Sequence, residues 1–241
     1  MLGIIAAAGL GSRMQSDLPK PLTLLPSGES FLSSAIRKLA SHVDETVVVT
    51  SEAVLMHPNF SKVEGCHYRI QLLPTGMGDA VFSVSDLIAH HNDVMVLWCD
   101  QIGITADTIA KTIEVHDSNR DNNRMTIPLL WKNSKYIHFQ IKDGCIEKIL
   151  QAKEGDIISE SAQSDVGLFL LSNGSQLVTN WFDGGREFAR GKVTSEFNFL
   201  PFLKYLNSNG WRFNRVEAID IDGIGVNTRA ELVEALRSLN I

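Results

Sequence analysis

The sequence predicts an α/β fold, with a Rossmann-like mixed, mostly parallel sheet and helices on both of its faces. Short apolar runs, typical of strands buried on both sides, alternate with segments of helical periodicity over the first 120 residues. That alternation is typical of βαβ units and of parallel strand pairing. After residue 124 the runs alternate between apolar and polar residues, which predicts a small antiparallel lobe.

The first half of the chain divides into strands and helices in turn. We expect strands at 2–7, 46–50, 68–73 and 94–99, because each is a short apolar or β-branched run. Apolar residues at helical spacing predict helices at 31–43, 76–89 and 106–116. Residues 8–30 are interrupted by glycine and proline, so we expect a long ordered loop there.

The second half begins with the predicted lobe near 125–165. Its strands are expected at 125–131, 137–141 and 145–150, and Lys142-Asp143-Gly144 predicts a hairpin turn because glycine accepts a positive φ. A core strand at 166–172, helices near 175–182 and 195–207, a strand near 213–219 and a helix at 228–239 follow. Because no repeat or linker interrupts the pattern, residues 1–241 are predicted to form a single domain.

Composition narrows the class of protein. The 241 residues carry 22 Lys and Arg against 28 Asp and Glu, a net charge of −6, so we expect neither nucleic acid nor a membrane surface as partner. The scattered cysteines at 66, 99 and 145 match no disulfide or zinc pattern and favour a reducing compartment. No signal peptide or membrane-spanning run is expected either. These features predict a cytoplasmic globular protein and leave its oligomeric state open.

The loop after the first strand has the chemistry of a phosphate site. It reads Ala6-Ala-Ala-Gly-Leu-Gly-Ser-Arg-Met-Gln-Ser-Asp-Leu-Pro-Lys-Pro-Leu22. Glycines after a buried strand let backbone N–H groups approach an anion, and Arg13 and Lys20 add positive charge. A Walker loop would need Gly-Lys-Ser/Thr, and a dinucleotide fingerprint would need a third glycine. The alternative is an ordinary glycine-rich turn with two solvated basic residues.

This segment resembles the signature of the sugar-nucleotide pyrophosphorylases, a family of nucleotidyltransferases. Residues 16–20, Ser-Asp-Leu-Pro-Lys, are particularly similar to the uridylyltransferase domain of the N-acetylglucosamine-1-phosphate uridylyltransferases. The resemblance implies the nucleotide-diphospho-sugar transferase fold and a triphosphate cradle in this loop. It implies that Arg13 and Lys20 act on the phosphates as catalytic residues, and that the nucleotide is bound by Ala6, Ala7, Ala8, Gly9 and Gly11.

A second segment resembles the base-reading part of the glucose-1-phosphate thymidylyltransferases. It reads Gln71-Leu-Leu-Pro-Thr-Gly76-Met-Gly-Asp-Ala80, and the resemblance implies that Gln71 and Gly76 bind the base. Glutamine offers a donor and an acceptor, which suits the imide edge of uracil or thymine. The alternative is an exposed glutamine at the end of a strand. Beyond a pyrimidine, the base stays open.

Two residues are candidate ligands for Mg²⁺. Asp100 ends a buried strand, and ligands of parallel sheets bind beyond the carboxyl ends of the strands. Mg²⁺ takes one or two protein ligands and completes its shell with phosphates and water. Residues 225–227 resemble the family's Gly-Val-Asn, which implies that Asn227 is the second ligand. The alternative places Asn227 in the turn before a capping box of Thr228 and Glu231.

The candidates for the sugar phosphate depart most from the family. The resemblance implies that Lys153 neutralises the acceptor phosphate, while Gln151 stands where a carboxylate is usual. Asp165 and Gly167 match the start of the family's sugar-binding strand, and Glu196 resembles its acidic residue. For each of them an ordinary surface polar residue is the alternative. These departures leave the identity of the acceptor open.

Taken together, these features imply an enzyme that moves a nucleoside monophosphate from an NTP, UTP or dTTP, to a sugar 1-phosphate. Pyrophosphate would be released in a Mg²⁺-dependent reaction. One alternative is cytidylyl or guanylyl transfer to a non-sugar phosphate acceptor, of the molybdenum-cofactor or phosphocholine type. Another is a nucleotide-binding regulator without turnover.

Overall fold

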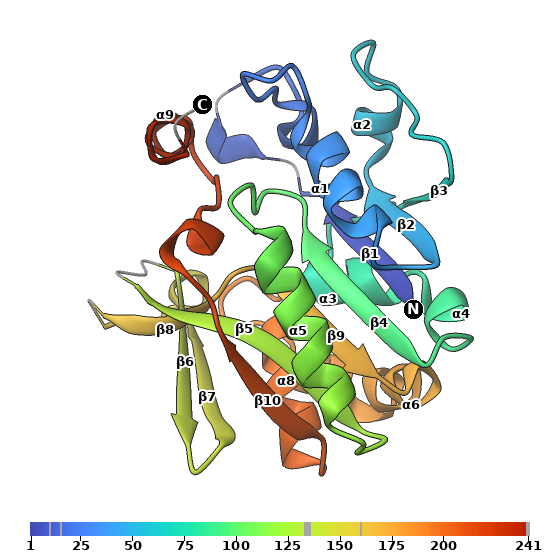
Figure 1. Ribbon diagram of the computed structural model, residues 1–241, viewed down its shortest axis with the longest axis vertical. Helices are drawn as coiled ribbons and strands as arrows, with labels where there is room; N and C mark the ends of the chain where they lie inside the picture. Colours follow the sequence, from blue (N-terminus) through green and yellow to red (C-terminus); the bar gives the residue numbers. More distant parts are fainter. Residues whose placement is uncertain (10, 15, 133–135, 160, 240–241) are drawn as a thin grey trace.

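The computed structural model describes residues 1–9, 11–14, 16–132, 136–159 and 161–239. Within these ranges the strands form one ten-stranded mixed sheet, shown in Figure 1, in the order β3-β2-β1-β4-β9-β5-β8-β6-β7, with β10 paired to β5. The strands are β1 Leu2–Ala7, β2 Glu45–Thr50, β3 Cys66–Ile70, β4 Asp93–Trp98, β5 Arg124–Lys132, β6 Ile137–Lys142, β7 Cys145–Gln151, β8 Ala162–Asp165, β9 Leu168–Ser172 and β10 Arg212–Glu217.

The sheet has a parallel part and an antiparallel part. Strands β3, β2, β1 and β4 run parallel, and β10 runs parallel to β5. Strand β9 is antiparallel to β4 and β5, β8 is antiparallel to β5 and β6, and β6 and β7 form a hairpin. Since β2 and β3 lie on one side of β1 and β4 on the other, the strand order reverses between β1 and β4. Ligands of open α/β sheets bind at such a reversal.

Helices cover both faces of the sheet, as predicted. Figure 1 shows α5 in front of the strands and α3 and α8 behind them. The helices are α1 Phe31–Ala40, α2 Glu52–Leu55, α3 Met77–Phe82, α4 Ser85–Ile88, α5 Ala106–Ser118, α6 Gly174–Asn180, α7 Arg186–Phe188, α8 Phe199–Ser208 and α9 Arg229–Ser238. Short 3₁₀ segments lie at η1 Ser12–Met14, η2 Lys20–Leu22, η3 Ala152–Glu154 and η5 Asp220–Gly223, with a kinked segment η4 at Trp181–Gly185.

Two cores result from the alternation of side chains along the buried strands. On β1, Leu2 and Ile4 pack into the core under α3 and α8, whereas Ile5 and Ala7 pack into the core under α1 and α5. Every residue of β1 is buried, which is what an unbroken apolar run requires. The sequence pattern is therefore explained by a central strand covered on both faces.

Three details differ from the expected elements. The helix expected at 76–89 is split into α3 and α4, because Val84 leaves helical geometry (φ −111°, ψ 32°) and is fully buried in the core. Strand β3 ends at Ile70 rather than at residue 73. The sequence pattern missed β8, because its residues Ala-Gln-Ser-Asp are mostly polar although all four are buried between β5 and β6.

The hairpin turn is confirmed. Asp143 (φ 50°) and Gly144 (φ 74°) both occupy the left-handed region between β6 and β7. Among the described residues, no helix is both long enough and apolar enough to cross a membrane.

Helix α1 is tied to the loop after β4 through a lysine. The ammonium of Lys38 donates a hydrogen bond of 2.6 Å to the carbonyl oxygen of Ile102. Burial, with a smaller contribution from the charge of Arg37, lowers the pKa of Lys38 from the ordinary 10.5 to about 8. The folded protein therefore releases this proton at a lower pH than the unfolded chain does.

We predict that Lys38 makes stability rise with pH over a defined interval. Between pH 8 and 10.5 the unfolded chain binds more protons at this position, so the free energy of unfolding increases through that window. Urea denaturation at pH 8 and 10 should show wild type gaining about 1–3 kcal/mol relative to Lys38→Met. An equal change in both proteins would contradict the assignment.

Candidate active site

The candidate site lies where the strand order reverses, at the carboxyl ends of β1 and β4. The loop after β1 carries Lys20, and Asp100 follows β4. The Lys20 ammonium forms an ion pair with the carboxylate Oδ2 of Asp100. The side chains are 13% and 26% exposed, so the pair is largely shielded from water. Two residues 80 positions apart are thus joined at the end of the sheet.

Asn227 is brought to the same place by backbone hydrogen bonds. The backbone amide of Val226 donates a hydrogen bond to the carbonyl oxygen of Asp100 (3.1 Å). The backbone amide of Gly103 donates one to the carbonyl oxygen of Ile224 (3.0 Å). A Cβ at Gly103 would overlap the carbonyl oxygen of Ile221, so the close approach requires glycine. As a result, Asn227 Oδ1 lies 3.4 Å from the Lys20 Nζ.

A buried carboxylate holds this carboxyl-terminal segment in position. Asp222 is fully buried. It accepts hydrogen bonds from the amide and hydroxyl of Thr105 (both 2.8 Å), the hydroxyl of Thr108 (2.6 Å) and the amide of Ile219 (3.0 Å). Because Thr105 is the N-cap of α5, Asp222 attaches the segment before Asn227 to the start of that helix.

Glu231 fixes Asn227 from the other side. The predicted capping box of Thr228 and Glu231 is confirmed at the start of α9. The same carboxylate accepts a hydrogen bond from the amide of Asn227 (2.6 Å) and one from the hydroxyl of Tyr136 (2.5 Å). The hydrogen bond to Glu231, together with burial, raises the pKa of Tyr136 above its ordinary value. The capping interpretation and the placement of Asn227 in the site are therefore compatible.

Arg13 lies at the edge of this group. Its Nη2 is 3.4 Å from Asn227 Oδ1, and its guanidinium carbon is 5.9 Å from the centroid of the Tyr136 ring. In Figure 1, α9 lies at the top of the view, near the loop that carries Arg13. The structure thus brings together Arg13, Lys20, Asp100 and Asn227, which the sequence analysis had assigned to one site.

The glycine loop packs directly against Lys20. Gly11 has a φ of 62°, and a Cβ there would lie 2.6 Å from the Cβ of Lys20. Gly9 has no heavy atom within 4 Å of an added Cβ, so space is open beside it. Ala6 and Ala7 are buried at the end of β1, and Ala8, which follows the strand, is buried as well. Leu10, part of the predicted cradle, lies outside the described residues.

Of the two candidate base residues, Gln71 lines a hollow of about 190 Å³ at the ends of β1, β2 and β3, and Gly76 is not among its lining residues. The hollow is lined by Ala8, Ser51, Glu52, Ala53, Ile70, Gln71, Leu72 and Pro74. The side chain of Gln71 donates to the carbonyl oxygen of Gly76 (3.1 Å), which joins the two predicted base contacts. Gly76 has a φ of 122°, and a Cβ there would lie 2.5 Å from the carbonyl oxygen of Phe197.

Gly76, one candidate base residue, contacts Phe197, which directly follows the acceptor candidate Glu196 in the chain. The amide of Phe197 donates to Thr75, and the amide of Gly78 donates to Phe197, both at 2.8 Å. Next to Phe197, Glu196 accepts a hydrogen bond of 2.7 Å from the ammonium of Lys153. The two acceptor candidates therefore form an ion pair with each other, with side chains 44% and 40% exposed.

A residue absent from the sequence prediction, Glu154, holds the loop that carries Glu196. Its side chain accepts hydrogen bonds from the amides of Val193 (2.9 Å) and Thr194 (3.2 Å), the Thr194 hydroxyl (2.5 Å) and the Asn198 side chain (3.1 Å). Burial raises the pKa of Glu154, but these four hydrogen bonds outweigh it and lower the pKa to about 2. No sequence signal distinguished it from its neighbours.

The remaining acceptor candidates are buried. Gln151 is 4% exposed and Asp165 is 8% exposed. The carboxylate of Asp165 accepts a hydrogen bond from the amide of Gly167 (2.9 Å), so it shapes the turn into β9. Gly167 has a φ of 73°, and a Cβ there would overlap the side chain of Gln101, next to Asp100. Gly167 thus adjoins the site, whereas Gln151 lies inside the fold at the end of β7.

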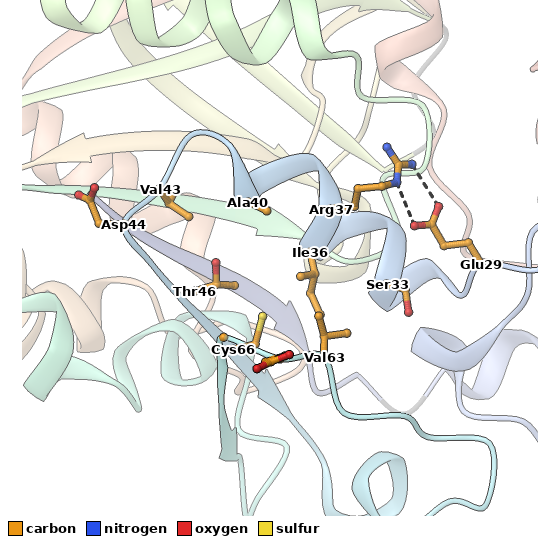
Figure 2. A pocket seen from close by; sticks show the side chains of 12 residues that line it. Glu29, Ser33, Ile36, Arg37, Ala40, Val43, Asp44, Thr46, Val63 and Cys66 are labelled. Atoms are coloured by element: carbon orange, nitrogen blue, oxygen red, sulfur yellow. Dashed lines mark hydrogen bonds and ion pairs between the residues drawn. The ribbon is translucent and has the colours of Figure 1, made fainter.

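A second and larger hollow, of about 480 Å³, lies between α1, β2 and residues 63–66 (Figure 2). None of the predicted site residues line it. At its rim the guanidinium of Arg37 donates two hydrogen bonds to Glu29, of 3.0 and 3.1 Å, as Figure 2 shows. Among the described residues that line this hollow, Arg37 is the one cationic side chain, and it is already paired with Glu29.

The residues at the strand ends fit a Mg²⁺ ion. One carboxylate oxygen of Asp100 and the amide oxygen of Asn227 both face a single cation, the Lys20 ammonium. Within the described ranges, no group of three His, Cys, Asp or Glu side chains could hold a metal. Mg²⁺ does not need such a group, because it takes most of its ligands from phosphates and water. The donor set suits a hard cation that arrives with phosphate oxygens.

Known protein families and solved structures resemble this chain. A family model described as the MobA-like NTP transferase domain matches residues 3–160. Relatives include the bifunctional protein GlmU of Gluconacetobacter diazotrophicus, 25% identical over 96% of this chain and 50% of its own length. GlmU of Lactococcus lactis subsp. cremoris is also 25% identical, with the same coverage. The chain therefore spans about half the length of the curated relatives it matches.

Two solved structures share the fold. One, from Bacillus anthracis and provisionally assigned as a glucose-1-phosphate thymidylyltransferase, has a TM-score of 0.74 and 18% identity over 99% of this chain and 95% of that one. The inositol-1-phosphate CTP transferase of T. maritima has a TM-score of 0.70 and 15% identity over 99% and 96%. At these low sequence identities, the structural similarity shows a shared fold and nothing more.

The fold and the family match define an enzyme of the nucleotidyltransferase class. More particularly, the chain belongs to the family of MobA-like NTP transferase domains. The resemblance identified in the glycine-rich loop is thereby confirmed.

We predict that Glu154 stabilises the Glu196 loop in a pH-dependent manner. Because its pKa is lowered from 4.5 to about 2, its contribution is complete above pH 4.5 and is lost as the pH falls toward 2. Glu154→Gln should lower the free energy of unfolding at pH 7 by about 1–3 kcal/mol, since one of the two acceptor oxygens becomes an amide nitrogen that faces hydrogen-bond donors. Glu147→Gln, on the exposed face of β7, is the matched control. Equal stability of Glu154→Gln and wild type at pH 7 would refute the role.

Proposed function

We propose that residues 1–241 act as one nucleotidyltransferase domain that moves a nucleoside monophosphate from an NTP to a sugar 1-phosphate. UTP or dTTP is the proposed donor. The observation that carries the proposal is the convergence of the glycine loop, Lys20, Asp100 and Asn227 where the strand order reverses. The Lys20 ammonium, the side-chain oxygens of Asp100 and Asn227, and the glycine loop thus lie together at the carboxyl ends of the strands.

In the proposed reaction, a phosphate oxygen of the sugar 1-phosphate attacks the α-phosphorus of the NTP. A new P–O bond forms there while the bond from the α-phosphorus to the bridging oxygen breaks, and pyrophosphate leaves with that electron pair. The chain forms no covalent bond with either substrate. Its task is to orient the two phosphates and to neutralise their charge.

Arg13 and Lys20 are the proposed triphosphate contacts. Both cations lie near the glycine loop, where Gly9 is open to an approaching group. The hollow lined by Ala8 and Gln71 is the proposed base site, because it adjoins that loop at the carboxyl ends of the strands. Gln71 keeps its amide oxygen for the base, since its nitrogen donates to Gly76.

The acceptor is proposed to bind between Lys153 and the site, beside the antiparallel lobe near 125–165. Lys153 is the one cation among the acceptor candidates, and its half-exposed pairing with Glu196 can be exchanged for a phosphate. Glu196, Asp165 and Gly167 are the proposed surroundings of the sugar. Because Gln151 is buried, we propose that it supports this region from inside the lobe.

Mg²⁺ is the proposed cofactor, held by Asp100 and Asn227. When bound, it would supply charge neutralisation at the phosphates. Asp100 provides the only formal negative charge of this pair, and the backbone hydrogen bond from Val226 to Asp100 keeps both side chains at the same strand end. Glu231 positions Asn227 by accepting a hydrogen bond from its backbone amide.

A second candidate is cytidylyl or guanylyl transfer to a non-sugar phosphate. It is supported by the MobA-like family match, by the structural likeness to an inositol-1-phosphate CTP transferase, and by the altered acceptor residues. Pyrophosphate release with Mg²⁺ distinguishes the candidates. UTP, dTTP, CTP and GTP would each be combined with sugar 1-phosphates, inositol 1-phosphate and phosphocholine. Release with UTP or dTTP and one sugar supports the first proposal, whereas release with CTP or GTP and another acceptor supports the second.

If no combination of substrates releases pyrophosphate while NTP still binds, the result would instead indicate a regulator without turnover. In that case neither transfer proposal stands. The fold and the nucleotide site would be unaffected by that result.

We predict that Asp100→Ala lowers the rate of pyrophosphate release at least 100-fold, because a charged ligand of the metal is lost. Because this substitution also leaves the 13%-exposed ammonium of Lys20 without its ion-pair partner, we expect a lower melting temperature, and circular dichroism checks that the variant is folded at the assay temperature. Asp107→Ala, at an exposed position of α5, is the matched control and should keep full activity. Retained turnover in Asp100→Ala would remove Asp100 from the proposed metal site.

A further inference from the structure

Lys20 occupies the position that the proposed metal would take. Its ammonium forms an ion pair with Asp100 Oδ2 and lies 3.4 Å from Asn227 Oδ1. These are the two oxygen groups proposed to hold Mg²⁺. The two proposed ligands therefore already share a cation, and that cation belongs to the protein.

A divalent ion and this ammonium cannot both stay in contact with the same two oxygens. The two cations would lie within a few ångströms of each other in a site where the lysine is only 13% exposed, so their repulsion is poorly screened. A metal ion must therefore displace Lys20. Removing one partner of a shielded ion pair is costly unless the displaced charge finds a new anion.

The glycine loop beside Lys20 can supply that new anion, because it is the proposed site of the triphosphate. The stem of Lys20 packs on Gly11, in the loop proposed to hold the triphosphate. Lys20 is the first residue of the 3₁₀ segment η2, whose other two residues, Pro21 and Leu22, are buried, so its main chain is anchored. Rotation about side-chain bonds alone would move the ammonium from Asp100 toward an anion on the glycine loop.

We infer that Lys20 is an internal cation that keeps divalent metal out of the site until a nucleoside triphosphate draws it away, so that the protein takes up the metal together with the nucleotide. This inference rests on the proposed function. It concerns the order and coupling of binding, which the transfer reaction does not itself require. By thermodynamic linkage, the nucleotide must raise metal affinity by the same factor as the metal raises nucleotide affinity.

The first test measures binding of Mn²⁺ alone, by electron paramagnetic resonance, with no nucleotide present. Lys20→Met keeps the length of the side chain and removes its charge, and we expect it to bind Mn²⁺ at least tenfold more tightly than wild type. Lys20→Arg keeps the charge and should bind as weakly as wild type. Adding Asp100→Asn to Lys20→Met should abolish the gain.

The matched control is Lys38→Met, the same substitution at another partly buried lysine, which contacts Ile102 and not the metal ligands. It should leave Mn²⁺ affinity at the wild-type value. Thermal melting followed by circular dichroism checks that each variant is folded. Equal Mn²⁺ affinity of folded Lys20→Met and wild type would overturn the inference.

The second test uses wild-type protein with Mn²⁺ and UTP, CTP or GTP. Relaxation of water protons distinguishes Mn²⁺ held by the protein from Mn²⁺ held by nucleotide in solution. We expect protein-bound Mn²⁺ to increase at least tenfold when a bound nucleotide is present. Metal binding that is equally tight with and without nucleotide would also overturn the inference.

These outcomes are separable from the proposed reaction. If no acceptor supports pyrophosphate release but nucleotide still raises Mn²⁺ binding through Lys20, the transfer proposal fails and the role of Lys20 stands. If pyrophosphate is released while Lys20→Met and wild type bind Mn²⁺ alike, the role of Lys20 fails and the transfer proposal stands.

Discussion

The candidate site depends on one contact, the docking of residues 219–227 against the carboxyl end of β4. The hydrogen bond from the amide of Val226 to the carbonyl oxygen of Asp100 places Asn227 next to that carboxylate. Gly103 allows the approach, because any side chain there would overlap Ile221. Asp222 completes the docking by accepting hydrogen bonds from the start of α5. Without this contact, Asp100 would face Lys20 without the side-chain oxygen of Asn227, the second proposed metal ligand.

The same contact explains why the carboxyl-terminal helix matters to a site at the opposite end of the chain. Helix α9 begins directly after Asn227, and its Glu231 accepts hydrogen bonds from that amide and from Tyr136. One carboxylate thus caps a helix and orients a proposed ligand. Tyr136 in turn lies beneath Arg13 from the first loop. Residues from three parts of the sequence support one another around a single strand end.

Charge pairing is the second organising feature of the site. Lys20 pairs with Asp100, and Lys153 pairs with Glu196. Each pair joins one cation that is proposed to meet a phosphate to one carboxylate. The first pair is shielded and the second is nearly half exposed, so the first is the stronger constraint.

The amino-acid sequence by itself determined the fold class, the order of the elements in the parallel half and the glycine-rich loop. Local patterns carry that information, because an unbroken apolar run such as 2–7 specifies a strand buried on both faces, and Gly144 specifies a hairpin turn. The position of Asp100 at a strand end, and the resemblance of the segments around Lys20 and Asn227 to the sugar-nucleotide pyrophosphorylases, also selected these three residues, although neither could give their separation. Tertiary structure alone decided that these residues share one cation position, that β8 is a strand, and that Glu154 holds the Glu196 loop. The physical reason is that hydrogen bonds and ion pairs between distant segments depend on how the sheet and helices pack, and no spacing within the sequence records that packing.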